Sequence, residues 1–256
     1  MLLSDDHQAV QDAVREFVQA EIAPHAAAWD KSGQFPAAQL RGLAALGCYG
    51  VAVPTEYGGA GLDYLALALM IEEIAAGDGA TSTIVSVNNC PVCSILMAFG
   101  NEDQKQRFLK PLARGEMLGA FCLTEPHVGS EAGGLKTSAV LEGDEYVLNG
   151  VKQFITSGKN GDVAIVMAVT DKAAGKRGIS AFLVPTTTSG YVVARVENKM
   201  GQHAQRHRTN PVRQLPGAGR QPHRRRRPGP EDRALGPGGR AHRHRQPGAR
   251  HGACRV

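Results

Sequence analysis

The spacing of hydrophobic residues along the chain changes near residue 116. Before that point apolar residues recur at steps of three and four, as Val10, Val14, Val18 and Ile22 do. This spacing places them on one face of a helix. Stretches of the same kind, ended by glycine or proline, cover residues 35–50, 62–79, 93–100 and 101–116. The pattern predicts an all-α helical bundle over residues 1–116.

From about Met117 to residue 204, apolar and polar residues alternate instead. The alternation covers residues 138–156, 163–171, 179–185 and 191–197, each bounded by Gly, Asp, Asn or Pro. Gly143 and Asp144 form the turn of a predicted hairpin. The fold class that follows is α+β and multidomain, with the helical bundle followed by an antiparallel β-barrel or sheet over residues 117–204.

Residues 205–256 show neither period. They contain 14 Arg and two acidic residues, a net charge of +12, whereas residues 1–204 contain 15 Lys and Arg against 22 Asp and Glu, a net of −7. A segment dominated by Arg, Gly, Pro and His cannot bury enough apolar surface to offset the cost of ordering it. We predict a disordered, low-complexity basic tail. Because such tails neutralise phosphates, a nucleic-acid binder is one alternative function.

Signals for targeting are missing from the sequence. Met1 is followed directly by a polar stretch, and nowhere do 18 uncharged apolar residues run together. We therefore expect a soluble, cytoplasmic protein that does not enter a membrane. Five cysteines form an odd set, and the pair Cys90 and Cys93 has no second pair to complete a zinc site, so no metal is predicted. Buried free thiols are favoured there over a redox pair.

Two stretches of the β region have the composition of a binding site. In GAFCLTEPHVGSEAGG, residues 119–134, a strand end runs into a glycine-rich loop that carries hydroxyls and open backbone N–H groups. Such a loop can approach a phosphate or a flat ring closely. In KQFITSGKNGD, residues 152–162, alternation places Phe154 and Thr156 on the same face of a strand. A ring and a hydroxyl together suit a planar cofactor, although a solvated turn and a core phenylalanine explain the two stretches equally well.

Together, and in this order after a helical half, the two stretches resemble the acyl-CoA dehydrogenase family, of the short- or medium-chain type. The resemblance covers nearly all of residues 3–204, including FPAAQLRGLAALGCYGVAVPTEYGGAGLDYLALALMIEEIA. It implies FAD as the cofactor and assigns cofactor contacts to Phe121, Cys122, Leu123, Thr124, Gly129, Ser130, Phe154, Ile155 and Thr156.

The family's contacts imply a role for each part of this set. The backbone at Leu123 and the hydroxyl of Thr124 hydrogen-bond the pyrimidine side of the flavin. Ser130 approaches the FAD pyrophosphate and also the substrate, although Glu131 after it departs from the family's usual Asp. Phe154 lies against the isoalloxazine, and Thr156 hydrogen-bonds near the ring nitrogen that receives hydride.

The function implied is α,β-dehydrogenation of an acyl-CoA thioester to the trans-2-enoyl-CoA. Electrons pass to an electron-transferring flavoprotein, and the intact enzyme is a homotetramer. The family's base is a glutamate in a C-terminal four-helix domain that residues 205–256 do not resemble, so no catalytic residue is assigned here and the chain itself is expected to be inactive. A related acyl-CoA oxidase or flavin monooxygenase would share the flavin cradle.

A slipped reading frame explains the tail better than nucleic-acid binding does. GC-rich codons read out of register yield Arg, Pro, Gly, Ala and His. Permitted codons for residues 205–246, read one base out of register, spell a sequence like the one that the family has after KMGQHA and at the start of its third domain. We predict a one-nucleotide slip near Ala204. Sequencing the DNA across the codons for Gly201 to Arg208 should reveal it, and an intact frame there would exclude it.

Overall fold

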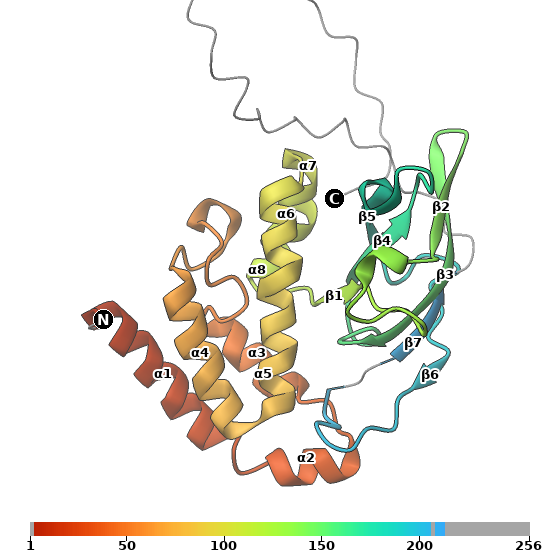
Figure 1. Cartoon of the computed structure of the whole chain (residues 1–256). Helices are drawn as coiled ribbons and strands as arrows, with labels where there is room; N and C mark the ends of the chain where they lie inside the picture. The colour runs from red at the N-terminus through yellow and green to blue at the C-terminus, as the bar shows by residue number, and fades with distance from the viewer. Residues whose placement is uncertain (1–2, 206–207, 213–256) are drawn as a thin grey trace, which may run out of the picture.

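The structure is a computed structural model that describes residues 3–205 and 208–212, with a helical half beside a β half (Figure 1). Short polar side chains begin the longer helices: Ser4 accepts a hydrogen bond from the His7 N–H at 3.3 Å, and Asp63 accepts one from the Ala66 N–H at 2.8 Å. The helices are α1 (Asp5–Glu21), α2 (Ala26–Ser32), α3 (Ala37–Ala45), η1 (Thr55–Tyr57), α4 (Tyr64–Gly77), α5 (Gly79–Val87), η2 (Asn88–Cys93), α6 (Ser94–Phe99), α7 (Glu102–Gln104), η3 (Lys105–Leu109) and α8 (Lys110–Ala113).

One helical run through α5, η2 and α6, Gly79–Phe99, lies in the core of the helical half. By length and composition alone it could cross a membrane. However, Ile84, Val92 and Leu96 are fully buried against neighbouring elements, so in this fold it is a core helix. The buried side chain of Asn88 donates to the carbonyls of Tyr49 (3.0 Å) and Leu112 (3.1 Å) and accepts from the N–H of Gly119 (3.0 Å). The run is thereby bound to the first strand.

The β half is one sheet, and its core includes Tyr146, Leu148 and Phe182. The predicted hairpin is present, with Ser138 opposite Asn149 and Glu142 opposite Glu145. The order is β1-β4-β2-β3-β7-β6, and β5 pairs with β4. The strands are β1 (Gly119–Cys122), β2 (Ser138–Glu142), β3 (Glu145–Ile155), β4 (Val163–Val169), β5 (Ile179–Pro185), β6 (Arg195–Val196) and β7 (Arg208–Val212).

Two pairings correct the prediction of a purely antiparallel sheet. β1 pairs with β4 in parallel, from Gly119 opposite Val163 to Cys122 opposite Val166, and β2 meets β4 in parallel at Ser138 and Val169. A parallel pair needs a long crossover, and here the glycine-rich loop and the β2–β3 hairpin lie between β1 and β4 in the sequence. Period-two alternation reports the faces of a strand but not its direction, so the sequence could not distinguish the two.

The last described strand lies inside the segment predicted to be a tail. β7 pairs with β3, which differs from the predicted boundary of the β domain at residue 204. Before it, residues 199–205 return to the helical half: the His203 N–H donates to Asp30 at 2.8 Å, and Ala204 is buried in the helical core. The prediction of disorder for residues 206–207 and 213–256 falls outside the described residues.

The cysteines of the described ranges are free thiols. Cys48, Cys93 and Cys122 are buried and Cys90 is exposed, while Cys254 lies outside the described ranges. Burial raises the pKa of the Cys93 thiol to about 12, which keeps it protonated and unreactive at neutral pH. In residues 3–205 and 208–212, no three His, Cys, Asp or Glu side chains gather as a metal site.

Candidate flavin site

The structure brings the two predicted site stretches together. The backbone N–H of Gln153 donates to the carbonyl of Thr124 at 2.9 Å, and the ammonium of Lys152 donates to the carbonyl of Leu123 at 3.0 Å. The end of β1 and the end of β3 therefore lie side by side. From Glu125 the chain leaves as a loop that includes a short reversal, closed by reciprocal hydrogen bonds of 3.0 Å between the backbones of Glu125 and Val128.

A buried ion pair fixes the base of this loop. Lys152 Nζ lies 2.8 Å from Glu125 Oε1, and their side chains are 0% and 1% exposed. The same carboxylate accepts hydrogen bonds from the N–H groups of Lys136 (2.8 Å) and Thr137 (3.0 Å), where the loop rejoins the sheet. Burial alone would raise the pKa of Glu125, but these hydrogen bonds outweigh burial and lower it to about 2. Burial lowers the pKa of Lys152, an effect that Glu125 opposes.

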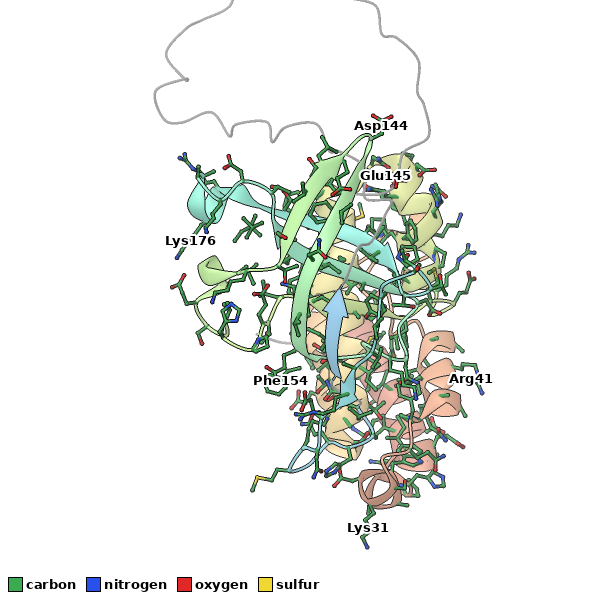
Figure 2. The ribbon with its side chains drawn as sticks, turned by 90° about the vertical axis from the view of Figure 1, so that its right-hand side faces the viewer. Lys31, Arg41, Asp144, Glu145, Phe154 and Lys176 are labelled. Carbon is green, nitrogen blue, oxygen red and sulfur yellow. The ribbon has the colours of Figure 1, made fainter. Side chains whose placement is uncertain are left out.

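Phe154 lies on the open side of β3. The buried residues Tyr146, Leu148 and Lys152 share one face of the strand, and strict alternation would place Phe154 there as well. A register shift against β7 between Lys152 and Ile155 interrupts the alternation, and Phe154 has a left-handed φ of 58°. Its side chain is 53% exposed and stands out from the end of the strand (Figure 2). The bulge thus presents an aromatic ring that the core would otherwise hold.

Thr156 follows the bulge and is held by a residue from the end of the described chain. The buried Gln205 side chain donates from Nε2 to Thr156 Oγ1 at 2.7 Å. The carbonyl of Gln205 accepts a hydrogen bond from Lys199 Nζ at 2.5 Å. The segment that contacts the helical half therefore also fixes the hydroxyl predicted to meet the cofactor.

Comparison with known proteins decides the family. The acyl-CoA dehydrogenase N-terminal domain matches residues 4–116, and the acyl-CoA dehydrogenase middle domain matches residues 120–212. The chain belongs to the acyl-CoA dehydrogenase family. The short-chain specific mitochondrial acyl-CoA dehydrogenase of Homo sapiens is 44% identical over 199 residues, which cover 78% of this chain and 48% of that protein. The chain spans about half the length of the curated relatives it matches.

Solved structures agree with this assignment. Butyryl-CoA dehydrogenase from Megasphaera elsdenii matches with a TM-score of 0.80 and 34% identity over 84% of this chain and 57% of that one. A glutaryl-CoA dehydrogenase from Mycobacterium smegmatis, solved in complex with FADH2, matches with a TM-score of 0.78 and 33% identity over 84% and 54%. The two halves of the chain therefore correspond to the N-terminal and middle domains of the acyl-CoA dehydrogenase family.

The residues that the sequence assigned to cofactor contacts lie in different environments. Cys122 and Ile155 are buried in the β core, so only their backbone can face a cofactor. Phe121 is half-buried against the core between the two halves. Gly129 and Ser130 are exposed in the loop, and a side chain added at Gly129 would meet open space.

Three further residues hold this site and were not predicted from the sequence: Glu125, Lys152 and Gln205. For Lys152 a signal was present, because the charged residue falls in phase with the buried Tyr146 and Leu148. A lysine at an inward position of an alternating strand indicates a buried partner. Gln205 carried no such signal, since its bond to Thr156 joins residues 49 positions apart.

The turn after Thr156 yields a stability prediction. Ser157 is buried with a left-handed φ of 59°, which costs a non-glycine residue about 1 kcal/mol or more. Ser157→Gly should be more stable than Ser157→Ala by about 1 kcal/mol, because both lack the hydroxyl and only Ala keeps the backbone strain. Urea unfolding of the two variants measures the difference, and equal midpoints would show that the turn is unstrained.

Proposed function

We propose that this chain forms the flavin-binding portion of an FAD-dependent acyl-CoA dehydrogenase, which converts a short- or medium-chain acyl-CoA to the trans-2-enoyl-CoA. The observation that carries the proposal is the exposed Phe154 ring, turned out of the sheet beside the segment Leu123–Glu125. A monomer gains nothing in stability from an exposed phenylalanine in a left-handed conformation, whereas a planar ligand can stack on it.

The residues present fit FAD. Phe154 offers a ring for the flavin, Thr124 and Thr156 offer polar groups at its edge, and the open loop at Gly129 and Ser130 admits a phosphate group close to the backbone. FAD, when bound, accepts the hydride from the substrate's β-carbon. In this proposal Phe154 orients the ring, and the threonines hold its polar edge.

Glu125 does not serve as the base that removes the substrate's α-proton. Its carboxylate is buried, bound by Lys152 and two backbone N–H groups, and its pKa of about 2 makes it a weak proton acceptor. Glu131 is exposed on the loop and pairs with Lys176 at 3.0 Å. We infer that the base belongs to the remaining half of the enzyme, as the resemblance implies. The other assignments carried from it are an electron-transferring flavoprotein as acceptor, a homotetramer and a cytoplasmic location.

FAD titration of the purified chain tests the proposal. We expect bound flavin, and we expect Phe154→Ala to raise the FAD dissociation constant about tenfold or more through lost stacking. Phe99→Ala is the matched control, because Phe99 is 61% exposed on the helical half and should leave the dissociation constant unchanged. No flavin binding by the wild-type chain, or equal losses in both variants, would contradict the proposal.

A further inference from the structure

Burying the charged side chain of Lys152 in the core of a sheet costs free energy. It lies fully buried on the face of β3 that also carries Tyr146 and Leu148. Removing an ammonium and a carboxylate from water costs about as much as their attraction returns, and apolar residues of similar volume often stabilise a fold equally well. The packing of the sheet therefore does not explain the charge. What distinguishes Lys152 from an apolar residue is its hydrogen bond to the carbonyl of Leu123.

That hydrogen bond sets the direction of the next amide. In a trans peptide the C=O and the following N–H point in opposite directions. Because the Leu123 carbonyl points at Lys152, the N–H of Thr124 points away from it. The other side of Thr124 is also fixed, since its own carbonyl accepts from Gln153 at 2.9 Å. Within the described part of the chain, the Thr124 N–H has no acceptor.

We propose that Lys152 is a positioning residue for the flavin: its ammonium holds the Leu123–Thr124 peptide so that the Thr124 N–H presents a fixed donor to the cofactor. This inference rests on the proposed function. Glu125 is the counter-charge that keeps the ammonium in place, and through Lys136 and Thr137 it also closes the loop around the same donor. The buried pair thus preorganises the start of the loop, at Leu123–Glu125, before the cofactor binds.

The test is the double variant Lys152→Met, Glu125→Gln in the chain of residues 1–256. It removes both charges together, so no unpaired ion stays buried. The Leu123 carbonyl and one of the N–H groups of Lys136 and Thr137 lose their partners, which should lower the urea midpoint. We expect the FAD dissociation constant to rise at least tenfold and the absorption bands of bound FAD to shift, because a hydrogen bond to the ring is lost. Arg107→Met is the matched control: its pair with Asp103 on the helical half is 59% and 65% exposed, and its removal should change neither the dissociation constant nor the absorption bands.

Amide hydrogen exchange in residues 121–128 without FAD separates this inference from the proposed function. We expect faster exchange there in the double variant than in the wild type. If the wild-type chain binds no FAD, the proposed function fails, and equal exchange in the two proteins would overturn the anchoring by Lys152 as well. If FAD binds both proteins equally and with the same spectrum, Lys152 does not position the flavin. If the double variant does not fold, the test is hydrogen exchange at the Thr124 amide of the wild-type chain, measured with and without FAD. We expect FAD to slow this exchange, and an unchanged rate would overturn the inference.

Discussion

Replacing Glu125 alone with glutamine should lower the free energy of unfolding by about 3 kcal/mol at pH 7. The substitution keeps the shape of the side chain but removes the negative charge that balances the fully buried ammonium of Lys152, which is then left with neutral acceptors. The magnitude follows from the pKa of Glu125, which lies at about 2 in the folded chain against an ordinary value of 4.5. Urea unfolding at pH 7 measures the loss.

The pH dependence of that loss has a definite sign. A carboxyl whose pKa is lowered by folding stabilises the native state above its ordinary pKa, and the contribution disappears as pH falls toward the folded value. The difference between wild type and Glu125→Gln should therefore be complete above about pH 5 and shrink between pH 4.5 and pH 2. Glu131→Gln is the control, since its exposed pair with Lys176 contributes little. A difference that stays constant down to pH 3 would contradict the role given to the charge.

The helices that the sequence predicted are those with a long apolar stripe. Val14 and Val18 are buried on one face of α1, and Ile22, which caps its end, is buried as well, as their spacing predicts. The helices α2 and α5 were not predicted, and α2, with seven residues, holds too few turns to show a period. The π-helical segment η3 ends at Leu109, and α8 begins directly after it. Pro111 lies in the first turn of α8, which ends at Ala113, so the helical stretch continues for two residues beyond the proline.

The site was predictable where the contacts are local and not where they are distant. Residues of QFIT were recognised as a group, yet the turn that exposes Phe154 depends on the pairing of β3 with β7, which is more than fifty residues away. Glu125 and Lys152 meet across 27 positions, and each residue alone is unremarkable in its own stretch. Pairs of residues this far apart in the sequence produce no periodic pattern. The inward position of Lys152 in the alternating strand was nevertheless a sign that it has a buried partner.

Asn88→Leu should uncouple the two halves of the molecule. The side chain is fully buried and satisfies three backbone groups that are distant in the sequence: the carbonyls of Tyr49 and Leu112 and the N–H of Gly119 at the start of β1. Leucine has a similar volume but can pair with none of them. Each orphaned buried group costs about 1–3 kcal/mol, so for three groups we expect a total loss of about 3 kcal/mol or more.

The loss should also separate two unfolding transitions that coincide in the wild type. Trp29, the single tryptophan, is buried in the helical core, and its fluorescence reports that half. Labelling of the buried Cys122 thiol, read by peptide mass, reports the β half. In Asn88→Leu the two urea midpoints should move apart, because the hydrogen bond from the Gly119 N–H that joins β1 to the helical half is lost. Asn198→Leu, which replaces an exposed asparagine, is the control and should change the free energy of unfolding of either half by less than about 0.5 kcal/mol. Coincident midpoints in Asn88→Leu, or a loss below about 1 kcal/mol, would show that the halves are joined by apolar contact and not through this side chain.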